Sequence, residues 1–347
     1  MENIQETNML VIPTTGKISS ETTLGLNDSG IIEADEFEED GQHPNFIESN
    51  TSAITLEELS TRNIIPTFSD NTLTISSQNF ITATAKMAEQ VFGELTPVEI
   101  RVSHPIIGRI PSAQHKKASE LLDEEKTVFY QRLAWCCHVR NITRYINGHL
   151  IHLCIGGIRA YSEDKLYNKA SPQKFHIFVG WQVRVCSNLM LTCDGNSGII
   201  ECMTEADIMQ KSLELFSSFN PHKEDTLCLL EHLQSTIVPE TLLMTMLGRM
   251  RLYQFLPSAE QKQLPPLSIG DQAINAMVKG YISNPNFGKK EGEDFTTWNL
   301  LQLMNESVKQ AYIDRWLDRN QNCTDFAIGI QKAINGEDTE GYNWFLN

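Results

Sequence analysis

Residues 175–191 form a largely apolar run, Phe-His-Ile-Phe-Val-Gly-Trp-Gln-Val-Arg-Val-Cys-Ser-Asn-Leu-Met-Leu, that contains the cation Arg184 and the amide Asn188. The run has the composition of a strand, which suggests that both of these polar groups are buried. Burial of such groups is costly unless they are paired. Residues 174–191 therefore predict one or two buried strands in which Arg184 and Asn188 are structural polar residues, paired with carboxylates or backbone across a sheet.

Length and composition are those of an ordinary globular chain. The 347 residues, of which 41% are hydrophobic and 21% charged, are enough for one large domain or two smaller ones. No apolar run approaches the roughly 20 residues that span a bilayer, and the N-terminus lacks the basic start and apolar stretch of a signal peptide. We therefore expect a cytoplasmic protein with no membrane partner.

The eight cysteines agree with a reducing compartment. The sequence has no Cys-x-x-Cys pair, and most of the cysteines lie inside apolar runs. Such cysteines are typical of reduced packing thiols rather than disulfides or zinc ligands. His149-x-x-His152 is the other candidate metal motif, but residues three apart in a strand point to opposite faces. We expect no bound metal and no cofactor.

Hydrophobic periodicity divides the chain into three regions. Residues 1–45 predict a disordered acidic tail, 46–202 a helical lead-in followed by a β-rich region, and 203–347 a helical region packed on it. The fold class is therefore α+β, with an antiparallel β-rich middle. Asn147-Gly148 predicts a hairpin. Gly156-Gly157 predicts a strand end with a bulge or turn, and its alternative is a backbone surface for a phosphate.

Helix signals are clearest where caps accompany the apolar spacing. The predicted segments are 77–92 ended by Gly93, a short helix capped by Thr55, a helix opened by Thr204, then 223–236, 239–255, 271–282, 297–318 and 325–335. Residues 112–126 also predict a helix. Residues 127–140 predict one long strand.

The net charge of −16 conceals a basic middle. Residues 99–190 hold seven acidic and 13 basic residues, a local charge of +6. Local charge, not the whole-chain value, attracts phosphate. The candidate phosphate contacts are Arg101, Arg109, Lys116, Lys117 and Arg159, and the candidate stacking rings are Tyr130 and Trp135. The alternative interpretation is that the cations lie on a solvated surface and that the aromatic rings belong to the core.

Catalytic motifs are missing from the sequence. It contains no Gly-x-Gly-x-x-Gly, Walker A, His-Glu-x-x-His or Gly-x-Ser-x-Gly pattern. No catalytic residue can be named, and we do not expect an enzyme.

Several segments resemble a known bacterial family, the domain of unknown function 3871. They are residues 99–104 (Glu-Ile-Arg-Val-Ser-His), 156–161 (Gly-Gly-Ile-Arg-Ala-Tyr), 248–257, 317–320 and 342–346. The resemblance covers nearly everything after residue 45. It implies a protein from mobile elements of Bacteroidetes-type bacteria and supplies no activity or catalytic residue. Residues 183–189 also resemble a motif of phage- and plasmid-type proteins of unknown function.

Our functional hypothesis is that the chain is a non-enzymatic accessory protein of a mobile element and that it binds nucleic acid, with single strands as the ligand. One alternative is a protein-interaction module that targets a host or element-encoded protein. Another is an unrecognised metal-dependent nuclease or transferase. The sequence leaves the partner and the oligomeric state open.

Overall fold

An antiparallel sheet forms the centre of the molecule. The computed structural model describes residues 44–49, 51–62, 74–164, 171–221, 224–338 and 340–347. In these residues the sheet has seven strands in the order β1 (Thr51–Ala53), β2 (Glu99–Ser103), β5 (Leu133–Ile146), β6 (His149–Arg159), β7 (Gln173–Val183) and β8 (Asn188–Met190), with β9 (Ile200–Cys202) paired to β7.

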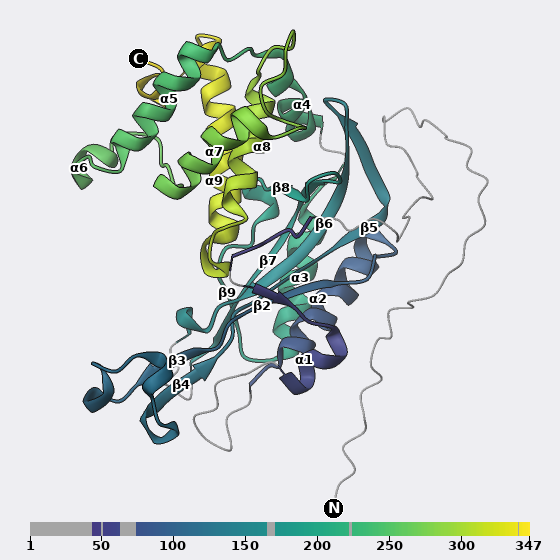
Figure 1. Ribbon diagram of the computed structural model, residues 1–347. Helices are drawn as coiled ribbons and strands as arrows, with labels where there is room; N and C mark the ends of the chain where they lie inside the picture. The colour runs from purple at the N-terminus through teal and green to yellow at the C-terminus, as the bar shows by residue number, and fades with distance from the viewer. Residues whose placement is uncertain (1–43, 50, 63–73, 165–170, 222–223, 339) are drawn as a thin grey trace, which may run out of the picture.

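The helices complete the predicted α+β class, a β-rich middle followed by a helical C-terminal half (Figure 1). The N-terminal helices are α1 (Leu56–Arg62) and α2 (Ser77–Phe92), and α3 (Glu205–Ser218) follows the sheet. The C-terminal helices are α4 (Glu224–His232), α5 (Glu240–Tyr253), α6 (Ser258–Gln261), α7 (Asp271–Ser283), α8 (Thr297–Val308) and α9 (Ile313–Ile334). None of the described helices combines the length and apolar character of a membrane-spanning helix. The predicted acidic tail lies almost entirely outside the described residues.

The hairpin between β5 and β6 forms where the sequence predicts it. Asn147 and Gly148 have positive φ angles of 51° and 78°, the backbone that a two-residue hairpin turn requires and that this residue pair tolerates best. The register of β5 against β6 shifts between His138 and Thr143. Such an irregularity increases the local twist, which curls the sheet.

Helices α2 and α3 cover one face of the sheet. Ser76 caps α2 by accepting a hydrogen bond from Asn79 N, and Gly93 ends the helix with φ 93°. The Phe80 ring packs on Phe175 at 4.7 Å between centroids. Gly157 makes this approach possible, because a Cβ there would lie 2.5 Å from the Phe80 ring. The Gly156-Gly157 pair therefore lies inside β6 and serves close packing, rather than forming the predicted turn at a strand end.

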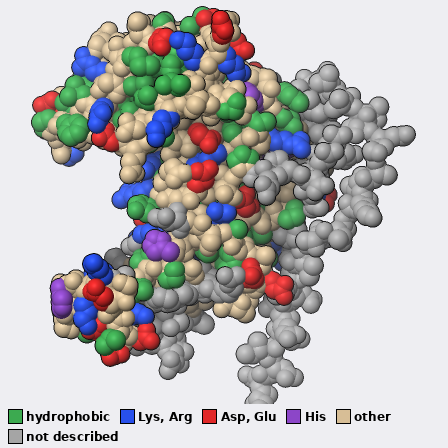
Figure 2. Space-filling view, in the orientation of Figure 1, with side chains coloured by type: hydrophobic (Ala, Val, Ile, Leu, Met, Phe, Trp, Pro, Cys, Tyr) green, Lys and Arg blue, Asp and Glu red, His purple; other side chains and the backbone are tan. Residues whose placement is uncertain are grey.

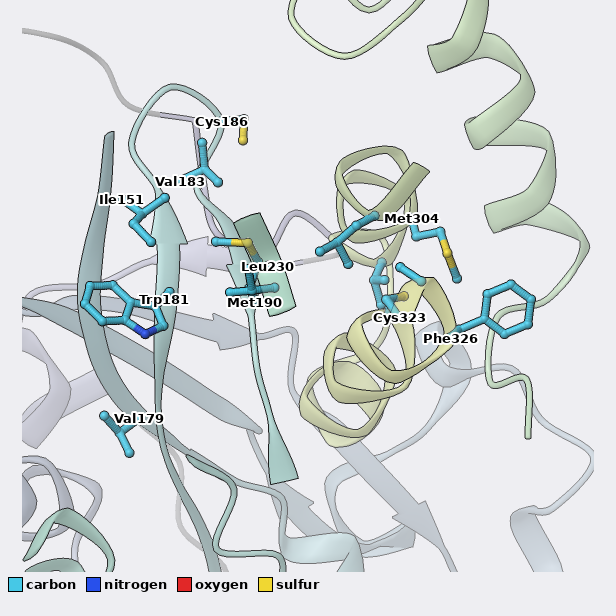
Figure 3. Packing of buried hydrophobic residues seen from close by; sticks show 14 of the residues in the cluster. Ile151, Val179, Trp181, Val183, Cys186, Met190, Leu230, Met304, Cys323 and Phe326 are labelled. Atoms are coloured by element: carbon cyan, nitrogen blue, oxygen red, sulfur yellow. The ribbon is translucent and has the colours of Figure 1, made fainter. Parts of the chain in front are cut away.

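The opposite face of the sheet is covered by the start of α9. Phe46 packs on Trp316 at 5.2 Å between ring centroids, and both belong to a core cluster that includes Ala134, Cys154 and Phe178 of the sheet. A larger cluster runs from the first face of the sheet into the C-terminal helices. Figure 3 shows its members from β7, β8, α8 and α9 in one view. The sheet and the C-terminal helices thus share one hydrophobic core.

Residues 174–191, for which the sequence predicts one or two strands, form the two strands of a hairpin. β7 ends at Val183, Ser187 adopts φ 55° and β8 begins at Asn188. Arg184 therefore lies in the turn and is half-buried rather than enclosed in a strand, and its N–H donates to Leu150 O at 3.0 Å. Asn188 is fully buried, and its Nδ2 donates to the backbone oxygen of Gln302 at 3.0 Å and to its Oε1 at 3.1 Å. This pair joins the hairpin to α8.

The predicted helix over 297–318 is wrong, because the chain breaks between α8 and α9. The backbone oxygen of Lys309 accepts hydrogen bonds from Glu48 N at 2.9 Å and Ser49 N at 3.3 Å, so it is not available to continue a helix. The Lys309 side chain is buried, and its Nζ donates to Cys186 O and to Glu306 Oε2. Helix α9 then runs without interruption from Ile313 and includes the predicted 325–335 segment.

Residues 104–131 form a separate structure, which we call the arm. The strands β3 (Ile106–Arg109) and β4 (Lys126–Tyr130) pair with each other as a two-stranded sheet, so the predicted long strand over 127–140 is divided between β4 and β5. The predicted helix over 112–126 is also wrong. Three short 3₁₀ turns replace it because Glu120 and Glu125 accept hydrogen bonds from the N–H groups of Lys117 and Leu122, which closes local turns instead.

We expect the substitution Asn188→Ala to destabilise the protein by about 1–3 kcal/mol, because it leaves buried polar groups of Gln302 without their donor. Urea unfolding followed by circular dichroism measures the change. Asn275→Ala, at an exposed position on α7, is the matched control and should leave the unfolding free energy nearly unchanged. Equal effects of the two substitutions would contradict a special role for the buried amide.

Candidate nucleic-acid interface

The arm carries three of the candidate cations. Arg109 and Lys117 are exposed, and Arg109 Nη1 donates to Gln114 O at 3.3 Å. Lys116 is half-buried and pairs with Glu125 at 2.5 Å. This contact holds the pKa of the Glu125 carboxyl below its usual range, chiefly through the hydrogen bond from Lys116. Arg109 and Lys117 are therefore the arm cations best placed to meet a ligand.

The base of the arm holds two arginines on one face of the sheet. Arg101 donates to Thr51 Oγ1 at 3.2 Å and to Asn45 Oδ1 at 3.1 Å, and it is half-buried. Arg132 pairs with Asp314 of α9 at 3.5 Å. Strand alternation puts both arginines on the face that α9 covers. The base of the arm and the start of α9 are consequently neighbours.

The first turn of α9 adds an exposed ring and an exposed cation that sequence reasoning did not select. Tyr312 is 58% exposed, and Arg315 is exposed with its backbone N–H donating to Tyr312 O at 2.9 Å. Asp314, the neighbour of Arg315 in the sequence, pairs with Arg132 at the base of the arm. Only the fold could show this, because Arg132 and Asp314 are far apart in the sequence.

The molecule is hollowed between the arm and the overhanging helices α5 and α6. Figure 2 shows this hollow in the space-filling surface, with lysine or arginine side chains on both of its sides. In the same orientation, the start of α9 lies at the level of the hollow, between the arm and α5 (Figure 1). An extended chain placed across the hollow would meet the arm on one side and the first turn of α9 on the other.

Three of the residues selected from the sequence lie in the interior. Trp135 is fully buried, Arg159 is 1% exposed, and Tyr130 is 7% exposed with its ring 5.5 Å from that of Tyr161. None of them is accessible to a nucleic acid in this structure. We therefore remove Tyr130, Trp135 and Arg159 from the candidate interface. Alternation along the chain could not distinguish an outward-facing side chain from a core one, because both faces of the central sheet are covered at Trp135 and Arg159 and Tyr130 packs on Tyr161.

Arg159 is held in a cage of aromatic and acidic groups. Its guanidinium lies 4.0 Å from the Phe175 ring centroid and 4.3 Å from that of Tyr161. It donates to Asp164 Oδ2 at 3.3 Å and to Gln173 Oε1 at 3.0 Å. Burial raises the pKa of Asp164, and the charge of Arg159 opposes that rise. The arrangement is that of a structural cation, stabilised by stacking and by a buried carboxylate.

Folding offsets much of the positive charge of the middle region. Among the described residues, four of its cations pair with acidic residues from outside residues 99–190, and three pair within that range. The first group is Arg132–Asp314, Arg140–Glu94, Arg144–Glu231 and Lys174–Glu201, and the second is Lys116–Glu125, Lys126–Asp123 and Arg159–Asp164. The local charge of +6 is therefore a property of the sequence segment rather than of the folded surface.

Three histidines of β5 and β6, His138, His149 and His152, are packed among other rings. His149 is stacked 6.2 Å from Trp298 and lies 4.9 Å from Phe287, and burial lowers its pKa. His152 lies on the other face of the strand, 5.5 Å from His138. Within the described residues, no cluster of three or more histidine, cysteine, aspartate or glutamate side chains could hold a metal ion.

The cysteines are free thiols. All eight lie in described positions, and Cys193 is the exposed one. Burial raises the pKa of Cys186 to about 12, and it raises the pKa of Cys137 well above the ordinary value. Thiols with such pKa values are almost entirely protonated at neutral pH and are poor nucleophiles. These buried thiols therefore contribute to packing rather than to chemistry.

Comparison with known proteins supplies the family. The family model described as "Domain of unknown function, B. Theta Gene description (DUF3871)" matches residues 27–346. The chain belongs to this family. The match extends over the sheet, the arm and the C-terminal helices of DUF3871, so the architecture described above is that of the family domain in this chain. No curated protein and no solved structure gives a significant match.

We expect Arg159→Met to lower the unfolding free energy by about 3–5 kcal/mol, because it leaves the buried Asp164 carboxylate without its partner. Urea denaturation gives the value. Arg109→Met, which removes an exposed guanidinium, should change it by less than about 0.5 kcal/mol. A small effect at Arg159 would show that the cage contributes little to stability.

Native protein treated with Ellman's reagent at pH 8 should release one equivalent of chromophore rapidly, from Cys193. Cys228, which is half-buried, should follow more slowly, and the six buried thiols should react only after unfolding. Cys193→Ser should abolish the rapid phase. Rapid reaction of several thiols in the variant would contradict the described burial.

Proposed function

We propose that this DUF3871 protein binds single-stranded nucleic acid across the hollow between the arm and the C-terminal helices. The observation that carries the proposal is that exposed cations belong to the two elements that border one concave surface, Arg109 and Lys117 to the arm and Arg315 to the start of α9, and that lysine or arginine side chains lie on both sides of the hollow (Figure 2). Tyr312 beside Arg315 supplies an exposed ring on which a base can stack. Arg101 and Arg132 lie behind this surface and position it.

A single strand fits this surface better than a duplex. Base stacking on a tyrosine requires an unpaired base, whereas phosphate contacts alone do not distinguish the two forms. Three exposed cations give few phosphate contacts, so binding should be weak and strongly dependent on salt. For single strands, three contacts correspond to a slope of about −2 in the logarithm of the binding constant against the logarithm of salt concentration.

We also propose that the protein acts as a non-enzymatic accessory factor of a mobile element, in the cytoplasm. The resemblance of residues 183–189 to the motif of phage- and plasmid-type proteins supports the first part. The free thiols support the second, because such cysteines persist in a reducing compartment.

Fluorescence anisotropy of labelled oligothymidylate with the full-length protein, over a series of salt concentrations, tests nucleic-acid binding. The double substitution Arg109→Gln and Lys117→Gln should weaken binding at low salt and reduce the magnitude of the salt slope by about 1.4, the contribution of two phosphate contacts. Tyr312→Ala should weaken binding with little change in slope, since stacking does not release counterions.

The matched control is Lys86→Gln with Lys211→Gln. It removes the same charge from exposed positions on α2 and α3, which cover the other face of the sheet. This variant should retain most of the wild-type affinity. Equal losses in the two double variants would show a diffuse electrostatic effect, and no binding by the wild-type protein at low salt would refute the proposal.

A further inference from the structure

The N-terminal end of the described chain is anchored at the base of the arm. Asn45 Oδ1 accepts a hydrogen bond from Arg101 Nη1 at 3.1 Å, and Phe46 packs on Trp316 at 5.2 Å between ring centroids. Trp316 directly follows Arg315, one of the cations proposed to bind nucleic acid, in the sequence. The chain that precedes Asn45 is therefore tethered between the base of the arm and the first turn of α9.

The tethered segment is strongly acidic. Residues 1–43, which lie outside the described part of the chain, contain ten acidic residues and one basic residue, a net charge of −9. Six of the ten lie within residues 33–40, which we call the acidic run: Glu33, Asp35, Glu36, Glu38, Glu39 and Asp40. The charge of this run is opposite to that of the exposed cations on the arm and on the first turn of α9.

Covalent geometry limits how far the acidic run can lie from its anchor. Because a chain spans at most about 3.6 Å per residue, the Cα atom of Asp40 is within about 18 Å of that of Asn45, and the Cα atom of Glu36 is within about 32 Å, in any conformation. Groups held by so short a tether reach effective concentrations in the millimolar range at a nearby surface. The carboxylates of the acidic run therefore compete with any phosphate that approaches the base of the arm.

We propose that the acidic run occupies the hollow between the arm and the first turn of α9, and that it competes there with single-stranded nucleic acid for Arg109, Lys117 and Arg315. The inference rests on the proposed function, since it assigns a regulation to the same surface. Attraction between the carboxylates and the cations is screened by salt over about 8–10 Å. A nucleic acid displaces the acidic run when its phosphate contacts and its stacking on Tyr312 together outweigh this attraction.

Two charge variants of the full-length protein test the competition. The near variant carries Glu36→Gln, Glu38→Gln, Glu39→Gln and Asp40→Asn, and the far variant carries Glu2→Gln, Glu6→Gln, Glu21→Gln and Asp28→Asn. Both variants lose four negative charges, and they differ in the distance along the chain from Asn45. Fluorescence anisotropy of labelled oligothymidylate at low salt should show about tenfold tighter binding by the near variant and a gain of less than about threefold for the far variant. The difference should shrink as the salt concentration rises.

The same titrations separate this inference from the proposed function. If the near variant binds no more tightly than the wild-type protein, or if both variants gain equally, the competition is refuted and the nucleic-acid site stands. If none of the three proteins binds oligothymidylate, the proposed function is refuted and the competition falls with it.

Zero-length crosslinking locates the acidic run in the absence of nucleic acid. A carbodiimide joins a carboxylate to a lysine amine that it contacts, and Lys117 is exposed on the arm. Mass spectrometry of the treated full-length protein should find residues 33–40 joined to Lys117 in preference to Lys86 and Lys211, which are exposed on α2 and α3. Excess oligothymidylate should suppress this product. Similar yields at all three lysines would show that the acidic run has no preferred place on the surface and would overturn the proposal.

Discussion

The architecture depends on a polar junction buried between the β7–β8 hairpin and α8. Asn188 donates to Gln302, and Lys309 donates to Cys186 O in the hairpin turn and pairs with Glu306. The main chain of residues 48 and 49 adds two hydrogen bonds to the backbone oxygen of Lys309. Buried polar groups of this kind are costly unless all are partnered in one geometry. The junction therefore fixes how the helices sit on the sheet.

That fixed placement determines the candidate interface. Because the chain breaks at Lys309, α9 starts anew and its first turn lies over the covered face of the sheet, where Asp314 meets Arg132. Tyr312 and Arg315 are consequently presented beside the base of the arm. The β7–β8 hairpin thus bears on the proposed interface through the position of α9, rather than through a side chain that touches a ligand.

The cations of the basic middle also divide into those that take part in ion pairs within the fold and those that are free to meet a ligand. Most cations of the basic middle are taken up by ion pairs, several of them to acidic residues far away in the sequence, and Arg159 is enclosed in an aromatic cage. Such partly exposed pairs contribute little stability individually. They nevertheless lower the positive potential available to phosphate. Among the described cations of this region, Arg109 and Lys117 are exposed, and both lie on the arm.

Elements that short-range interactions define could be predicted from the sequence. The caps at Thr55 and Thr204, the stop at Gly93 and the turn at Asn147-Gly148 act within a few residues, and the structure has each of them where it was predicted. Which side chains face outward depends on contacts between distant segments. Trp135 and Arg159 are buried because both faces of the sheet are covered, Tyr130 is buried beside Tyr161, and Tyr312 is exposed because α8 ends at a contact with residues 48 and 49. Burial depends on packing between distant segments, which periodicity along the chain does not encode.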